Sequence, residues 1–364
     1  MESQHAHEDL DGCHLQKRWD SIDFIKGLAC IAVVFIHVKF PWPFAKPVTA
    51  FSRFAVPFFF AVSGFFFTSH GACNLASTAR KLRHALILGL GATITLAVLT
   101  IIEGALDPRL SVIGFFRNHA NAKDVAKFFI TNAPPPPLVH LWFLWSLVYC
   151  YLFALVWFSD GKWLGSSGAL GLILLIGMIL FQEFVNKLPF NPEIPFREMQ
   201  IKFCHTFIFR ALPFFLLGIW AKKNEMVIRK NKLSTWLYVL FVFVGGIASV
   251  VEYRQFGNSQ FYLGNYLMVA AMFAWAICYQ DYGWKPIVFV GRRLSLLVYV
   301  LHIAVWSYFS ILLRALHINE STLVRWILPI IVALLAILVA FAIDRIRWWC
   351  VNKWNVLGAK GVFK

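Results

Sequence analysis

The stretch SIDFIKGLACIAVVFIHVKF, residues 21–40, decides the class of fold. It is an almost unbroken apolar run of about the 20 residues that a helix needs to cross a bilayer. Nine more stretches of similar length and character follow it along the chain. The ten expected spans cover approximately 22–41, 51–69, 84–103, 139–158, 165–183, 203–221, 234–251, 261–279, 295–313 and 324–343. The sequence therefore predicts an all-α integral membrane protein of about ten transmembrane helices.

The composition supports lipid as the solvent of this chain. Of its 364 residues, 59% are hydrophobic and only 14% are charged. A soluble domain is nearer half apolar and a quarter charged. The 37 Phe and 15 Trp are spread along the whole length, as expected for lipid-facing surfaces and interfacial aromatic belts.

The formal charge of +16 belongs to short Lys and Arg clusters between the apolar runs. This pattern indicates topology and contact with anionic lipid headgroups, so no nucleic-acid partner is expected. With the N-terminus inside, the inner segments hold more Lys and Arg than the outer ones. The positive-inside rule then places both termini in the cytoplasm.

One membrane domain accounts for nearly the whole chain. We assign residues 1–20 to a polar cytoplasmic tail, 21–345 to the membrane domain and 346–364 to a basic cytoplasmic tail. The seven Cys form no Cys-x-x-Cys pair, so neither a disulfide framework nor a metal site is expected. In the first tail, a polar disordered leader is favoured over metal binding by His5, His7, Cys13 and His14.

Two ionisable side chains share one face of the first span. Lys26 and His37 are eleven residues apart, which places them about 20° from the same face and roughly 16 Å apart along a helix. Ionisable groups in a span are costly and thus candidate functional groups, and imidazole suits proton transfer near neutral pH. In the alternative interpretation, Lys26 snorkels and His37 only hydrogen-bonds a neighbouring helix.

The second span and the segment after it carry two further patterns. Ser63 and Gly64 form a step that permits close helix packing, with catalysis as the less favoured role for the serine. Arg80 and Arg83 lie three residues apart, a spacing at which two guanidinium groups can clamp phosphates. Taken alone, this pair also suits an anchor in an inner loop.

The combination is more specific than its parts. Lys-x10-His in the first span, Phe-Phe-x-x-Ser-Gly at 59–64 and Arg-x-x-Arg at 80–83 occur in this order. HLWFL at 140–144, FFLLG at 214–218 and SLLVYVLH at 295–302 follow downstream. In these features the chain resembles the acyltransferase-3 family of membrane O-acyltransferases, as a stand-alone member without a fused esterase-like domain.

The resemblance implies an activity and its co-substrate. Family members move acyl groups from cytoplasmic acyl-CoA onto extracytoplasmic or lipid-linked carbohydrates, and acetyl-CoA is the expected donor here. Lys26, Arg80 and Arg83 would then bind the phosphates of CoA. His37 would act as general base on the acceptor hydroxyl or carry the acyl group transiently. The expected location is the bacterial inner or plasma membrane, with multiple passes.

Further polar residues in or beside the spans are candidates for binding the acceptor. An arginine among them would stabilise the tetrahedral oxyanion. Interface anchoring is the alternative for Arg53 and His140, and joining of two helices is the alternative for His302. The candidate substrate-binding residues are Arg53, Ser63, Glu103, His140, Arg210 and His302.

Two other function classes compete with the enzyme. A polysaccharide or small-molecule transporter or flippase would also use buried charges in about ten helices, but needs no acyl donor. A membrane anchor or sensor would leave the intramembrane Lys, His and Arg without a role beyond packing. The expected partners are membrane lipids and a carbohydrate acceptor, and the oligomeric state is left open.

Overall fold

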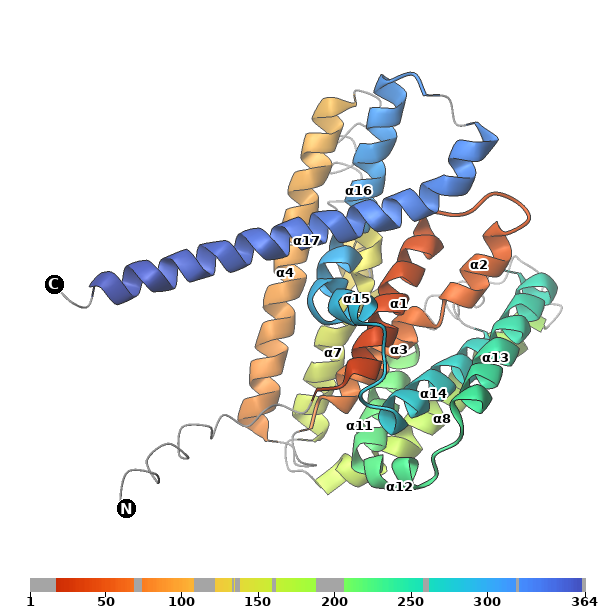
Figure 1. Ribbon diagram of the computed structural model, residues 1–364. Helices are drawn as coiled ribbons and strands as arrows, with labels where there is room; N and C mark the ends of the chain where they lie inside the picture. Colours follow the sequence, from red (N-terminus) through yellow and green to blue (C-terminus); the bar gives the residue numbers. More distant parts are fainter. Residues whose placement is uncertain are drawn as a thin grey trace, which may run out of the picture.

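The computed structural model describes residues 18–68, 74–107, 122–132, 134, 138–158, 162–187, 206–257, 262–318 and 321–361. All regular structure within these ranges is helical (Figure 1). Most of the predicted leader, with its His and Cys residues, lies outside them.

The helices run antiparallel or obliquely to one another around a shared core (Figure 1). In chain order they are α1 (Asp20–His37), α2 (Ala45–Ser52), α3 (Ala55–Phe65), α4 (Leu75–Leu106), α6 (Ala122–Thr131), the 3₁₀ turn η1 (Leu138–Leu141), α7 (Trp142–Trp157), the 3₁₀ turn η2 (Lys162–Ser166), α8 (Ser167–Lys187), α10 (Phe207–Arg210), α11 (Leu212–Lys223), α12 (Glu225–Lys230), α13 (Thr235–Phe256), α14 (Leu263–Cys278), α15 (Lys285–Phe289), the π-helical turn η3 (Val290–Leu294), α16 (Ser295–Ala315) and α17 (Thr322–Gly361).

Each of the ten predicted spans falls on one helix or on two consecutive helices. Within the described residues, six helical stretches are long and apolar enough to cross a membrane. They are Ala45–Phe65, Leu75–Leu106, Leu138–Trp157, Thr235–Gln255, Lys285–Ala315 and Thr322–Asn352. Leu164–Leu180 and Leu263–Cys278 are apolar but shorter. The protein is thus a multi-pass, all-helical membrane protein, and the total of ten spans and the side of the termini stay predictions.

Two predicted spans are interrupted, which the apolar pattern did not indicate. The second is split between α2 and α3 at Arg53, and the sixth is split between α10 and α11 after Arg210. Pro213 lies in the first turn of α11, where its missing N–H costs no helical hydrogen bond. Both arginines therefore sit at helix ends inside the bundle.

Glycines bring α3 and α11 into close contact. A Cβ atom on Gly64 would fall on the carbonyl oxygen of Phe215, and one on Gly218 would fall on that of Ala61. The neighbouring Ser63 hydroxyl donates to the Phe59 carbonyl of its own helix at 2.8 Å. Gly64 therefore permits the close packing of α3 on α11, and substrate binding by Ser63 stays a prediction.

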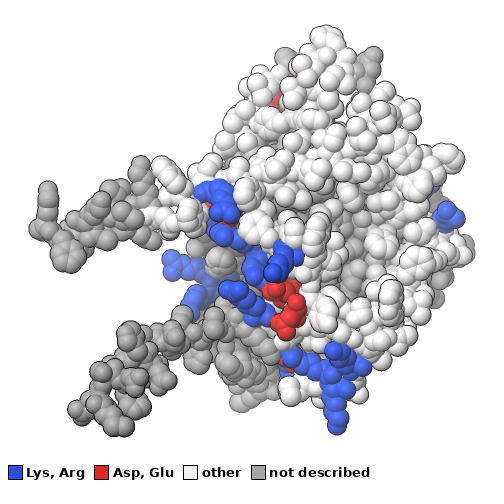
Figure 2. Space-filling model, in the orientation of Figure 1, with Lys and Arg blue, Asp and Glu red and all other residues white. Residues whose placement is uncertain are grey.

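Helix α1 lies at the centre of the bundle, against α2, α3, α14, α16 and α17 (Figure 1). Helix α17 crosses this group and continues beyond it to Gly361, so most of the segment predicted as a C-terminal tail extends the last helix. On the face in Figure 2, most of the visible Lys and Arg gather in a band across the lower half. Most of the upper half is uncharged, as a lipid-facing surface requires.

Candidate active site

Three histidines from distant parts of the chain meet inside the bundle. His37 ends α1, His140 lies in η1, and His302 lies on α16. Their ring centroids are 5.1 Å apart for His37 and His302, 5.4 Å for His140 and His302, and 6.2 Å for His37 and His140. His140 and His302 are buried and His37 is half-buried, so His37 is the accessible member of this histidine cluster.

Backbone carbonyls decide which nitrogen of each buried imidazole carries the proton in the neutral form. His302 Nδ1 lies 2.7 Å from the Tyr299 carbonyl oxygen and 3.2 Å from that of Val298. A carbonyl only accepts, so Nδ1 is the donor and Nε2 carries the lone pair. That Nε2 atom is buried and has no hydrogen-bond partner among the described residues. His302 therefore offers an unused acceptor inside the cluster.

The same reasoning applies to His140, whose position is fixed by α16. His140 Nε2 lies 3.3 Å from the Val300 carbonyl oxygen, so Nε2 donates and Nδ1 accepts. The Tyr299 hydroxyl in turn donates to the His140 carbonyl oxygen, and its ring packs on Phe143 at 5.4 Å between centroids. These contacts hold η1 and α16 together and set the relative positions of His140 and His302.

Two arginines lie beside this cluster at the interrupted helices. The Arg210 guanidinium stacks 3.9 Å from the centre of the Trp142 ring, and Arg53 lies 6.0 Å from the Tyr262 ring centre. The charges of Arg53 and Arg210 act on each other, and that of Arg53 also acts on His37. Arg210 is buried, where a cation–π contact partly replaces the lost hydration of the guanidinium. The pair supplies positive charge next to the imidazoles.

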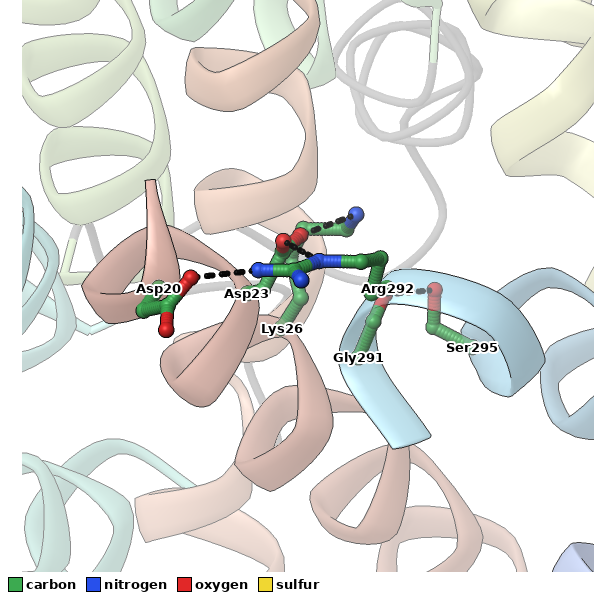
Figure 3. A network of polar contacts seen from close by, with 6 residues as sticks. All are labelled: Asp20, Asp23, Lys26, Gly291, Arg292 and Ser295. Carbon is green, nitrogen blue, oxygen red and sulfur yellow. Dashed lines mark hydrogen bonds and ion pairs between the residues drawn. The ribbon is translucent and has the colours of Figure 1, made fainter. Parts of the chain in front are cut away.

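Lys26 belongs to a separate network at the other end of α1 (Figure 3). Its Nζ lies 3.0 Å from Asp23, and Arg292 bridges Asp23 at 2.7 Å and Asp20 at 2.5 Å. Arg292 reaches this position because η3 packs directly on α1, with Gly291 against the Asp23 backbone. The sequence did not single out Arg292, because Arg292 and Arg293 resemble the other short clusters of Lys and Arg that indicate membrane topology.

Of the two arginines predicted to clamp phosphates, the structure places one in a cavity. Arg80, Lys81 and His84 line a cavity of about 340 Å³ between α4 and α7, with Leu144 and Tyr151 on the opposite wall. Arg83 is exposed on the same helix and is not part of the lining. Lys81 donates to the Phe66 carbonyl at 2.8 Å and to the Phe67 carbonyl, at the end of α3. The sequence did not single out His84. Its position one helical turn after Arg80 is the signal that could have indicated it.

Two predicted substrate-binding residues make helix contacts in the structure, and their role in substrate binding stays a prediction. Glu103 accepts a hydrogen bond from Ser307, and Arg314 pairs with Asp107 at 2.8 Å in the same α4–α16 contact. Ser63 bonds its own helix, as described above. Among the described residues, no group of three or more His, Cys, Asp or Glu is arranged to hold a metal ion, the histidine cluster included.

The family model Acyl_transf_3, described as an acyltransferase domain, matches residues 19–345. This match spans nearly the whole chain and includes the histidine cluster, Arg53, Arg210, the Lys26 network and the cavity on α4. The chain belongs to the acyltransferase-3 family. No curated protein and no solved structure matches it. As a member of the acyltransferase-3 family, the protein is a membrane acyltransferase, and the histidine cluster is its candidate active site.

Proposed function

We propose that this acyltransferase-3 protein moves an acetyl group from cytoplasmic acetyl-CoA onto a hydroxyl of a cell-surface or lipid-linked carbohydrate. The histidine cluster carries the proposal. The ring centroids of the accessible His37 and of His302 lie 5.1 Å apart, and the Nε2 atom of His302 is an unused hydrogen-bond acceptor. An accessible imidazole such as that of His37 suits deprotonation of a hydroxyl, which is the chemistry that O-acylation needs.

The residues support the following reaction. His37 takes the proton of the acceptor hydroxyl while the hydroxyl oxygen forms a bond to the acyl carbon. The C–S bond of the thioester then breaks, and the protonated His37 returns the proton to the CoA thiolate. His302 Nε2, which is unpaired in this structure, would accept a hydrogen bond from the His37 ring in the reacting complex and hold its orientation. Alternatively, a His37 nitrogen attacks the thioester carbon and the C–S bond breaks, which gives acyl-His37 and the CoA thiolate. The acceptor hydroxyl then attacks the acyl carbon, the N–C bond breaks, and the hydroxyl proton passes to the thiolate.

The positive charge beside the cluster supports the acyl-transfer step. During attack, negative charge develops on the carbonyl oxygen of the thioester, and fixed positive groups stabilise it most in a site that excludes water. Arg53 and Arg210 are held near the imidazoles by aromatic contacts. We assign these arginines to stabilisation of the oxyanion or to binding of the acceptor, because the acceptor hydroxyl must lie beside the same carbonyl group.

The cavity lined by Arg80, Lys81 and His84 supports a polyanionic donor. Guanidinium and ammonium groups bind phosphates by charge-assisted hydrogen bonds, and CoA carries several phosphates. Leu144 and Tyr151 complete its wall on α7, the helix that follows η1 and His140. The donor would therefore enter along the α4–α7 contact, with Lys26 at the neighbouring end of α1.

The deciding experiment uses the full-length protein in nanodiscs with radiolabelled acetyl-CoA and carbohydrate acceptors. The wild type should consume the thioester and label the acceptor, and His37→Ala should lose roughly 10²- to 10⁴-fold in turnover. His317→Asn is the matched control, because His317 is an exposed histidine after α16 and outside the cluster. Label kept on the protein would select the acyl-histidine route.

A transporter or flippase without acyl chemistry makes the opposite prediction. Folded wild-type protein would then neither bind nor consume acetyl-CoA or other acyl-CoAs, acceptors included. Equal consumption by wild type and His37→Ala would instead place the chemistry away from the histidine cluster.

A further inference from the structure

A large apolar groove opens between α1, α2, α13 and α14, away from the donor cavity. Its volume is about 850 Å³. Among the described residues its lining is apolar apart from Ser52 and Arg254. Lipid chains fill any apolar surface of this kind in a membrane. The length of the groove and the charge at its end therefore decide which lipid it prefers.

The length of the groove matches one leaflet of a bilayer. Its lining on α13 extends from Val242 to Arg254, which is about 18 Å at the helical rise. The hydrocarbon core of a bilayer is about 30 Å thick, so one leaflet contributes about 15 Å. A chain lying in the groove would thus reach from the middle of the membrane to one surface.

The charged end of the groove lies on the same side of the bundle as the candidate active site. Tyr253, next to Arg254, packs against Tyr262 with the rings tilted and their centroids 5.9 Å apart, and Arg53 lies 6.0 Å from the centre of the Tyr262 ring. Ser52 lines the groove directly before Arg53, whose charge acts on His37. A headgroup held at Arg254 would therefore be at the level of the histidine cluster.

We propose that this groove binds the hydrocarbon chain of the phosphate-bearing lipid that carries the carbohydrate acceptor. The lipid phosphate lies at Arg254, and the attached carbohydrate extends towards Arg53 and His37. An exposed guanidinium at the end of an apolar groove complements a phosphate at the end of an apolar chain. The nature of the headgroup rests on the proposed function, whereas binding of the chain does not.

A second apolar groove of about 600 Å³ provides an internal control. It lies between α4, α16 and α17, and among the described residues its lining contains no charged side chain. This control groove offers a lipid chain the same kind of apolar surface without a phosphate site. A phosphate-bearing lipid should therefore distinguish the two grooves.

The test uses a long-chain polyprenyl phosphate with a photoreactive group on its chain. Full-length protein in nanodiscs of a zwitterionic phospholipid is mixed with this probe and illuminated, and the labelled peptides are mapped by mass spectrometry. Label is expected on α2 and α13. Unlabelled polyprenyl phosphate should compete about tenfold better than polyprenol, because a charge-assisted hydrogen bond is lost with the phosphate.

Two variants and one control locate the site. Ile247 lines the groove and is 52% exposed, so Ile247→Trp should fill the groove without disturbing the core and should abolish label on α2 and α13. Arg254→Gln should remove the preference for phosphate over polyprenol. Val339→Trp, at a 39% exposed position of the control groove, should change neither result.

Label that is unaffected by Ile247→Trp would overturn the inference. So would equal competition by an ordinary anionic phospholipid, which would make the occupant bulk lipid. Because labelling needs neither donor nor turnover, label in the groove without acetyl-CoA consumption would count against the proposed function alone. Consumption by the same preparation without label in the groove would count against the groove alone.

Discussion

At the scale of single residues, His302 is the most informative side chain. Its ring is fully buried, and its Nε2 atom lacks a hydrogen-bond partner among the described residues. A buried acceptor without a partner costs stability, and in the proposed reaction this acceptor pairs with His37. The Nδ1 bonds to the α16 backbone hold the ring so that this acceptor is presented in a single orientation.

Replacing His302 should therefore separate activity from stability. We expect His302→Phe to keep the ring volume and to change the melting temperature little, because the loss of the Nδ1 hydrogen bond is offset by removal of the buried, unpaired Nε2 atom. Turnover should fall by roughly 10²-fold or more, whereas the donor KM should hardly change. His317→Asn serves again as the control, since His317 is an exposed histidine outside the cluster. Full turnover by His302→Phe would remove His302 from the mechanism.

The two arginines on α4 should differ in donor binding, although their sequence pattern treats them alike. Arg80 lines the cavity between α4 and α7, and Arg83 does not. Arg80→Gln should raise the KM for acetyl-CoA about tenfold, the effect of one charge-assisted contact. Arg83→Gln should raise it much less, and steady-state kinetics on both variants would show the difference. Equal effects would mean that the donor lies outside this cavity.

At the scale of helices, close packing of α3 on α11 is what places the interrupted spans. A Cβ atom on Gly64 has no room, because the backbone of Phe215 occupies its position. Backbone atoms cannot move aside as a flexible side chain can, so the two helices would have to separate. Arg210 in α10 and His37 in α1 lie on elements that adjoin this contact.

Gly64→Ala should therefore destabilise the protein, by about 1–3 kcal/mol as for other overpacked sites. Gly91→Ala is the matched control on α4, because a Cβ there meets nothing within 4 Å. That change should be neutral or stabilise by up to about 1 kcal/mol, since alanine favours the helix. Thermal unfolding of both variants in detergent measures the difference, and equal melting temperatures would argue against the contact.

A second helix contact, at the end of α11, should respond to pH. Glu225 bonds Lys222 at 2.7 Å and Arg229 at 2.6 Å, and both cations lie over the Trp19 ring. Burial raises the pKa of the Glu225 carboxyl, but the hydrogen bonds and charges of Lys222 and Arg229 outweigh it and lower the pKa below its usual value.

A carboxyl with a lowered pKa stabilises the folded state above its ordinary pKa, and this contribution is lost as the pH falls through the lowered value. The melting temperature of the wild type should thus fall more steeply below about pH 5 than that of Glu225→Gln. At neutral pH the variant should be the less stable of the two. Parallel curves would show that the contact contributes nothing.

At the scale of the whole molecule, charge and hydropathy are distributed as the membrane requires. The Lys and Arg in Figure 2 form a band across the lower half of the face shown, and most of the upper half is uncharged. Long apolar side chains such as Ile94, Val156 and Leu338 are exposed, as expected for surfaces that contact lipid. This distribution sets the orientation that we predict, with both termini in the cytoplasm.

Cysteine labelling in a cysteine-free background tests that orientation. Cys350 alone, on the exposed last part of α17, should react with an impermeant maleimide only after the membrane is opened. Lys46→Cys alone, exposed in α2, should react in intact cells, because it lies on the predicted outer side. The reverse pattern would invert the predicted topology and the side from which the donor enters.

The sequence alone indicated that this protein lies in a lipid bilayer, that it is helical and that it resembles the acyltransferase-3 family. Apolar runs of span length can satisfy their backbone groups in lipid only as helices, so periodicity and length decide the class locally. The Lys26 to His37 spacing and the ordered motifs after it carried the family, which the match over 19–345 confirms. The close helix packing at Gly64 was also predictable, because it depends on residue size.

Only the tertiary structure decided which of the candidates share a site. It brings His37, His140 and His302 together across the chain and places Glu103 and Ser63 in helix contacts. It also shows the helix breaks at Arg53 and Arg210, which apolar runs conceal because a short interruption leaves the hydropathy unchanged. Whether such side chains meet depends on how helices that are far apart in the sequence pack together. The positions of polar residues along the chain do not indicate this packing.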